Sequence, residues 1–237
     1  FGGEGQGGEY HSIYDSYDLF VKFKDPGFQY GVALSKTAGR AVMRMANADV
    51  LPFDVNSFYK TVGEYVTEVK TLLDNTRTET DQENKMIQDK LYSLAKDPTK
   101  TYYPPKIKET VPFLNFSNLE NVMVQLKNSS EELMKHYDSA AQLPAEKQKE
   151  LNEILFKLER SLINEKGLPR RSWYKHQIYA PGYYTGYGVK TLPGIREAIE
   201  QRYWKEAQDN IEIVSKTLDK YSQQIQLATD IILKKAF

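Results

Sequence analysis

The chain has 237 residues, which is enough for one large domain or two small ones. Its 32 lysines and arginines balance its 32 aspartates and glutamates, so the formal net charge is zero and nucleic acid is not expected as a partner. The absence of cysteine excludes a disulfide framework, a thiolate zinc site and a cysteine nucleophile. No targeting segment is visible, and we interpret the chain, which begins at Phe1 without an initiator methionine, as a piece of a longer protein.

Apolar residues recur at helical spacing along most of the chain and predict a mainly helical protein. Residues 1–10 contain too much glycine for a regular element and predict a glycine-rich tail. Four prolines in residues 97–114 predict a connecting loop. We expect an all-α fold, an antiparallel helical bundle of about four long helices plus shorter ones. The helices predicted before the last one lie near residues 28–48, 58–73, 78–95, 117–137 and 145–162.

The last predicted helix has the clearest pattern, because its apolar residues alternate spacings of three and four over more than four heptads. This seam consists of Trp204, Ala207, Ile211, Val214, Leu218, Tyr221, Ile225, Ala228 and Ile232. The large aliphatic residues outside the seam are Ile213, Leu227, Ile231 and Leu233. They are available either to other helices of the same bundle or to a second subunit.

Two segments do not follow the helical pattern, namely Gly2–Tyr17 and Leu168–Gly194. The second segment is long for a connection in a compact domain and is crowded with tyrosine, tryptophan and basic residues. Its composition fits two interpretations, an ordered loop that covers one end of the bundle or the wall of a functional site. The residues alone leave both open.

The three histidines have different sequence contexts. We interpret His136 as a satisfied helix residue and His176 as a hydrogen-bonding strut in the aromatic loop. His11 follows the glycine-rich tail, and a lone histidine of this kind is more often structural than a metal ligand. No complete metal-binding, phosphate-binding or nucleophile motif occurs in the sequence.

The run Tyr10–Tyr17, with the sequence YHSIYDSY, resembles a motif of the glutamate carboxypeptidase II family of zinc peptidases. The resemblance extends over nearly the whole chain, except for an insert around residues 76–114. Its further matches follow in the same order along the chain: Phe23, Asp25–Pro26, Phe28–Tyr30, Ala46–Asn47, Val50–Asp54, Leu158–Arg160, Gly167–Pro169, Trp173–His176, Ile178–Pro181, Tyr187 and Pro193–Ile195.

The resemblance implies a definite organisation. Residues 1–25 correspond to the end of an upstream peptidase domain, and residues 26–237 correspond to a transferrin receptor-like helical domain that forms a homodimer. The family's peptidase domain binds two zinc ions and acts on peptide substrates, and the histidine of the motif, here His11, is the last zinc ligand. Tyr10 and Tyr187 correspond to residues of the substrate pocket, which the aromatic loop closes. The resemblance also implies an extracytoplasmic location for the protein.

The sequence departs from the family at one position of the pocket. Glutamate carboxypeptidase II has a lysine directly before the pocket tyrosine, where this chain has Gly186. This change puts a preference for a C-terminal glutamate in doubt, and Lys190 and Lys175 are nearby substitutes.

A di-zinc site needs several histidine and carboxylate ligands, and one imidazole cannot define a zinc geometry. We therefore expect no catalytic residue, no tight zinc binding and no peptidase activity in this chain alone. Two other hypotheses remain open at this stage: a receptor-like homologue without catalysis, and an autonomous helical interaction module.

Overall fold

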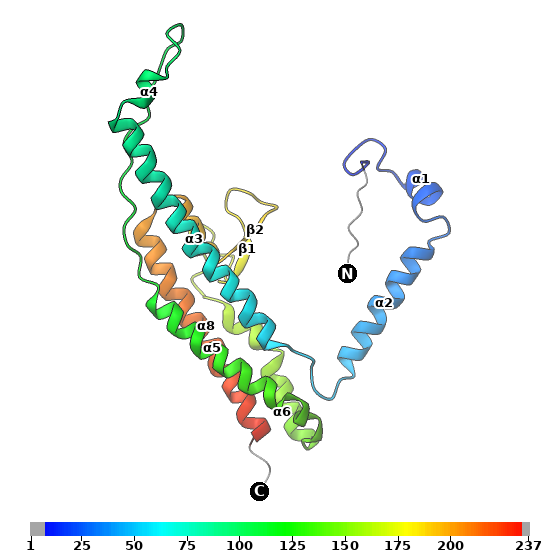
Figure 1. Cartoon of the computed structure of the whole chain (residues 1–237). Coiled ribbons are helices and arrows are strands. Elements are labelled where there is room, and N and C mark those ends of the chain that lie inside the picture. Colours follow the sequence, from blue (N-terminus) through cyan, green and yellow to red (C-terminus); the bar gives the residue numbers. More distant parts are fainter. Residues whose placement is uncertain (1–7, 234–237) are drawn as a thin grey trace. The chain divides into compact units, whose positions relative to one another are not determined.

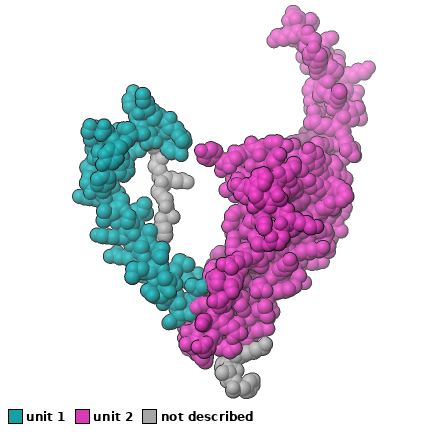
Figure 2. Space-filling view, turned by 180° about the vertical axis from the view of Figure 1, so that it is seen from behind, with its two compact units in different colours: residues 1–52 teal, residues 53–237 magenta. Residues whose placement is uncertain are grey.

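The chain divides into two compact units, Phe1–Pro52 and Phe53–Phe237 (Figure 2), and a computed structural model describes residues 8–233 of it. The described part of the chain is mainly helical, which confirms the predicted class. Seven residues of the predicted glycine-rich tail, 1–7, lie outside the described part. None of the helices within residues 8–233 combines the length and the apolar character that crossing a membrane requires.

The first unit contains a short α1, a π-helical turn and the longer α2. Asp25, which is buried, accepts hydrogen bonds from the backbone N–H groups of Tyr30 (2.9 Å) and Gly31 (2.8 Å) at the start of α2. Among residues 8–52 it is the only buried residue, so this unit contains no apolar core of its own. The elements are α1 (Tyr17–Leu19), the π-helix (Phe20–Lys24) and α2 (Gln29–Ala46).

The second unit contains three long helices that lie beside one another, α3, α5 and α8 (Figure 1). Shorter elements pack on α8, notably α6 and α7, and a two-stranded hairpin projects beside them. The helices are α3 (Val55–Gln88), α4 (Leu91–Leu94), α5 (Ser117–His136), α6 (Ala145–Leu155), α7 (Pro193–Glu200) and α8 (Trp204–Leu233). Two 3₁₀ turns cover Tyr137–Gln142 and Leu158–Leu162, and the strands are β1 (Tyr179–Pro181) and β2 (Val189–Thr191).

The predicted seam on α8 forms the centre of the core. All of its residues are buried except Trp204, which is half-buried. They pack chiefly against α5, whose Leu119, Leu126 and Leu133 are fully buried. Burial of each such large aliphatic side chain contributes roughly 1.5–3 kcal/mol, so this pair of helices accounts for much of the stability of the unit.

The prediction of a purely antiparallel bundle is wrong for one helix pair. Side-chain contacts join Asn118 to Glu212 and Ser129 to Ser222, so the residue numbers rise together and α5 and α8 run parallel. In contrast, Lys70 of α3 bonds to Glu120 of α5, and Gly63 lies near Met123. The residue numbers of one helix fall as those of the other rise, so α3 runs antiparallel to α5. The parallel pair is possible because the long connection between the two helices returns the chain to the same end before α8 begins.

The predicted break between residues 73 and 78 is also wrong, because α3 continues through this stretch. The hydroxyl groups of Thr76 and Thr80 donate to the carbonyl groups four residues earlier, at 2.7 and 2.6 Å, so these threonines satisfy their polar groups within the helix. The helix is capped at its start by Asp54, whose carboxylate accepts from the N–H groups of Asn56 and Ser57. It ends before Lys90, which has a left-handed backbone conformation.

Candidate functional site

The predicted aromatic loop contains a β-hairpin that the sequence pattern did not indicate. In this hairpin β1 pairs antiparallel with β2, and residues 182–188 form the tip. The N–H of Gly182 donates to the carbonyl of Gly188 at 2.9 Å and closes the tip. A Cβ atom at Gly182 would lie 2.2 Å from the hydroxyl of Thr185, and Gly186 has φ +60°, so both positions favour glycine.

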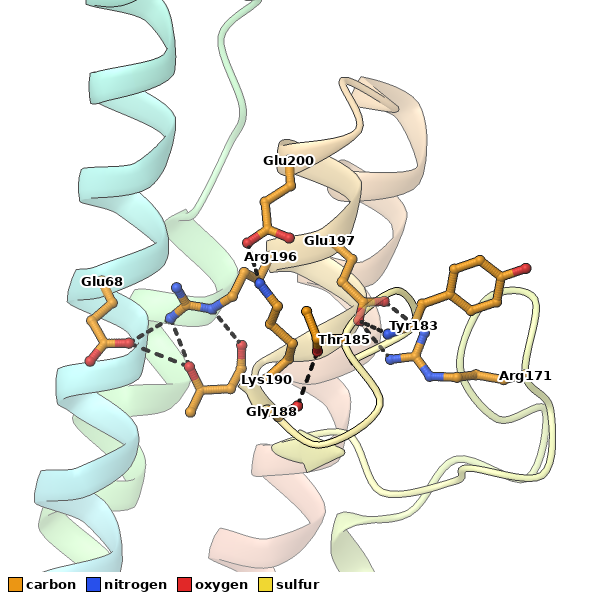
Figure 3. A network of polar contacts seen from close by, with 10 residues as sticks. Glu68, Arg171, Tyr183, Thr185, Gly188, Lys190, Arg196, Glu197 and Glu200 are labelled. Carbon is orange, nitrogen blue, oxygen red and sulfur yellow. Dashed lines mark hydrogen bonds and ion pairs between the residues drawn. The ribbon is translucent and has the colours of Figure 1, made fainter. Parts of the chain in front are cut away.

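A buried ion pair anchors the first half of the tip. The guanidinium of Arg171 forms two hydrogen bonds with the carboxylate of Glu197 on α7, at 2.7 and 2.9 Å. Arg171 and Glu197 are only 3% and 5% exposed. The N–H of Tyr183 also donates to Glu197, at 2.9 Å, so this carboxylate joins the tip to the helical core (Figure 3). Such charge-assisted hydrogen bonds are strong in a water-excluded setting.

A second set of contacts holds β2 against the long helix α3. Arg196 of α7 bonds to Glu68 of α3 at 2.5 Å and to the carbonyl and hydroxyl groups of Thr191 at 3.0 and 2.7 Å. Lys190, which precedes Thr191 in β2, pairs with Glu200 at 2.7 Å (Figure 3). These contacts fix β2 to α3 and α7, while the contact of Tyr183 with Glu197 fixes the first half of the tip to α7.

The tip carries three tyrosines with different environments. The ring of Tyr183 lies near the guanidinium groups of Arg170 and Arg171, at 5.6 and 5.7 Å, and packs edge-on against Tyr184. Tyr184 is exposed, and Tyr187, the predicted pocket residue, is 99% exposed. Tyr187 therefore lies on a hairpin that is attached to helices, while its own side chain makes almost no contact with the rest of the unit.

His176 is the hydrogen-bonding strut that the sequence predicted. Its Nε2 lies 3.0 Å from Glu159, and its Nδ1 accepts from the N–H groups of Ile178 and Tyr179, both at 3.3 Å. The hydroxyl of Tyr179 donates to the same carboxylate at 2.8 Å. The hydrogen bond from His176 lowers the pKa of the Glu159 carboxyl, and the bond to Glu159 raises the pKa of Tyr179. His136 is satisfied within α5, where Glu132 lies 3.0 Å from its Nε2.

Tyr10 and His11 lie in an exposed turn of the first unit, whereas Tyr187 belongs to the second. Tyr10 is 72% exposed, and its ring centroid lies 4.0 Å from that of the imidazole. His11 has φ +61°, and its side chain is exposed as well. Beside it, the ion pair of Glu9 with Lys24 lowers the pKa of the Glu9 carboxyl. The imidazole is therefore accessible to a ligand from outside the turn.

The described residues do not fit a complete zinc site. Within residues 8–233 no three histidine or carboxylate side chains converge as metal ligands would. A tetrahedral zinc site with one open position needs three protein ligands, of which His11 would be one. Any such site must therefore draw its other ligands from beyond the described part of this chain.

The sequence interpretation missed the ion pair between Arg171 and Glu197. A signal for Glu197 was present, because it stands among the apolar residues Ile195, Ala198 and Ile199 along α7. A carboxylate at such a position is expected to have a cationic partner. Arg171 carried no comparable signal, since it is one of several basic residues in the aromatic loop.

Comparison with known proteins adds independent information. Residues 114–226 match the family described as the transferrin receptor-like dimerisation domain. The chain is 28% identical over 216 residues to the probable glutamate carboxypeptidase LAMP1 of Arabidopsis thaliana, covering 88% of this chain and 26% of the relative. It is 24% identical over 230 residues to aminopeptidase NAALADL1 of Rattus norvegicus, covering 94% and 26%. It is 23% identical over 217 residues to a Schizosaccharomyces pombe protein named as an inactive zinc metalloprotease, covering 92% and 24%.

The chain thus spans about a quarter of the length of the curated relatives that it matches. The matched range contains α5, α6, α7, the hairpin and most of α8, which together form the core of the second unit. These findings agree with the resemblance carried by the ordered sequence motifs. Residues 114–226 are therefore similar to the transferrin receptor-like dimerisation domain, and most of the chain is similar to proteins named as glutamate carboxypeptidase or aminopeptidase.

Proposed function

We propose that this chain is the homodimerisation and active-site-closing part of a di-zinc exopeptidase similar to glutamate carboxypeptidase II. The observation that carries the closing role is the hairpin, which is fixed to α7 and α3 and presents an exposed tyrosine at its tip. Relatives are named both as carboxypeptidase and as aminopeptidase, so the shared activity class is exopeptidase. Peptide is the substrate class, and the working enzyme includes an upstream peptidase domain.

Residues 1–25 form the end of that peptidase domain in this proposal, and residues 26–237 form the helical domain. His11 supplies one ligand to a pair of zinc ions, whose chemistry is the activation of water. The accessible imidazole supports this role. The first unit also needs a covering surface, because Val32, Val42 and Met45 of α2 are exposed. Since three quarters of the relatives' length lies outside this chain, we assign that surface to the upstream domain.

Tyr10 and Tyr187 contact the substrate in this proposal. Gly186 removes the lysine that the family places before the tyrosine, and the two nearby lysines are already engaged. Lys190 pairs with Glu200, and Lys175 pairs with Glu165. We therefore assign no C-terminal glutamate preference to the enzyme. An extracytoplasmic location follows from the same resemblance and belongs to the proposal.

The dimer is the part of the proposal that this chain can test alone. Of the four aliphatic residues outside the α8 seam, Ile231 is buried by the chain itself, whereas Leu227 and Leu233 remain 48% exposed. Leu227 lies next to the end of the range that matches the dimerisation domain. A two-fold contact would use each exposed residue twice, so we propose that a second copy covers this end of α8.

Sedimentation equilibrium of the full 237-residue chain over a concentration series tests the dimer. We expect twice the chain mass at tens of micromolar, and a shift toward monomer in Leu227→Lys. Leu94→Lys is the matched control, because Leu94 is 80% exposed but belongs to α4, whereas Leu227 belongs to α8 and directly follows the matched range. A wild-type chain that stays monomeric would show that the bundle alone does not carry the dimer.

A non-catalytic receptor-like homologue is the second candidate, and one observation favours it. The Schizosaccharomyces pombe relative is named as an inactive zinc metalloprotease. The two candidates differ in the sequence that precedes this segment in the intact protein. Histidine, aspartate and glutamate ligands in that sequence support the peptidase, and their replacement supports the receptor-like protein.

A further inference from the structure

Glu197 connects three segments that are far apart in the sequence. Its Oε2 accepts from Nη1 of Arg171 in the aromatic loop, and its Oε1 accepts both from Nη2 of Arg171 and from the N–H of Tyr183 in the hairpin tip. The carboxylate itself belongs to α7, which packs on α8. Figure 3 shows the carboxylate of Glu197 facing both Tyr183 and the guanidinium of Arg171. Within residues 8–233, the hydrogen bonds of this buried carboxylate therefore join Arg171 and the tip residue Tyr183 to α7.

Arg171 is specialised for the same contact. It is nine-tenths buried or more, and its Nε has no hydrogen-bond partner, so Glu197 receives all of its side-chain hydrogen bonds among the described residues. A lysine could not reproduce this paired geometry, because an ammonium group lacks the planar fork of the guanidinium. The guanidinium also lies 5.7 Å from the ring of Tyr183, so it supports the same residue whose N–H Glu197 accepts.

We propose that Arg171 and Glu197 are positioning residues that fix the direction in which the hairpin tip leaves the helical core. The tip's internal bonds, from Gly182 to Gly188 and from Gly186 to Gly182, give it shape but do not attach it to a helix. The hydrogen bond from the N–H of Tyr183 to Glu197 fixes the start of the tip relative to α7. It thereby fixes the positions from which the side chains of Tyr184 and Tyr187 project. That the tip closes over a substrate rests on the proposed function. The attachment of the tip to α7 does not depend on that function.

The test must separate positioning from general stability. Glu197→Ala leaves a buried guanidinium without a partner and can unfold the chain, so it is not decisive alone. The double variant Arg171→Met/Glu197→Leu removes both charges and keeps apolar volume, which restores the core but provides no acceptor for the N–H of Tyr183. Lys190→Gln/Glu200→Gln is the matched control, because it neutralises a partly exposed pair that joins β2, and not the tip, to α7.

Amide hydrogen exchange of the full chain is measured at Gly182 and Gly186, relative to Leu218 in the core of α8. In Arg171→Met/Glu197→Leu we expect the tip amides to exchange about tenfold faster or more relative to Leu218, the factor that one lost charge-assisted hydrogen bond gives. The control variant should leave this ratio unchanged. If the exchange rates of the tip amides relative to Leu218 are unchanged in the double variant, the proposal is overturned. The tip would then keep its position without the contacts of Arg171 and Glu197.

A second measurement distinguishes this inference from the proposed function. In the intact peptidase, the double variant should raise KM for a peptide substrate more than it lowers kcat, because a loosened tip weakens binding without touching the zinc site. Faster tip exchange together with an unchanged KM supports the positioning role and removes the closing role of the hairpin. Unchanged exchange overturns the positioning role whatever the kinetics show.

Discussion

Nε2 of His176 lies 3.0 Å from a carboxylate oxygen of Glu159, and this contact joins the aromatic loop to the 3₁₀ turn that precedes it. Because Nδ1 accepts two backbone N–H groups, Nε2 must carry the proton and donate to Glu159. The donated hydrogen bond lowers the pKa of the Glu159 carboxyl, against the opposing effect of its partial burial.

This contact predicts a pH-dependent effect of Glu159→Gln. A carboxyl whose pKa is lower in the folded state contributes stability above its unfolded pKa of about 4.3 and loses it as the pH falls through the folded value. Since Glu159 is more than half exposed, we expect a loss of less than about 1 kcal/mol at pH 6. The difference from wild type should shrink at pH 3, as measured by urea unfolding. An equal difference at both pH values would contradict the assignment.

Two glycine substitutions in helices should have opposite effects. A Cβ atom at Gly194 would lie 2.2 Å from Oδ1 and 2.7 Å from Cγ of Asn210, which is buried and bonded to the carbonyl of Glu206. Gly194→Ala should therefore destabilise the chain by about 1–3 kcal/mol. Gly63→Ala meets only Met123, at 3.8 Å, and should stabilise α3 by about 0.5–1 kcal/mol. Chemical unfolding measures the free energy of unfolding of both variants. Changes of the same sign in the two variants would refute the packing argument.

His11→Ala should abolish peptidase activity in the intact protein and leave the helical fold unchanged. The side chain is exposed, and residues 8–52 around it contain no apolar core, so its removal costs little packing. A lost ligand removes metal-activated water. Zinc content, activity and thermal unfolding are measured together, with His136→Ala as the control histidine of α5. Near-normal kcat at unchanged zinc content would show that His11 is not a ligand.

Tyr187→Phe should weaken substrate binding in the intact protein by roughly 1.5–3 kcal/mol, the value of a charge-assisted hydrogen bond to a substrate carboxylate. Stability should not change, because the side chain is almost fully exposed. Tyr184→Phe, which alters the neighbouring exposed tyrosine of the tip, is the matched control. If KM and kcat of Tyr187→Phe equal those of wild type, Tyr187 does not line the pocket.

The sequence by itself determined the approximate place of most long helices and which face of α8 is buried. Those properties follow from the repeat of apolar residues along one segment, and the seam from Ala207 to Ile232 is buried as predicted. It also determined the role of His176 as a strut, because its loop is rich in groups that form hydrogen bonds. The functions of Tyr10, His11 and Tyr187 stay predictions that rest on the resemblance.

Only the tertiary structure decided the parallel pairing of α5 with α8, the hairpin and the contacts of Arg171 and Glu197 at its base. Helix direction depends on how far the connections carry the chain, which periodicity does not encode. The strands are three residues each, too short for an alternating pattern. Arg171, Tyr183 and Glu197 meet because two separate parts of the aromatic loop converge on α7, and a local pattern contains no information about such a contact.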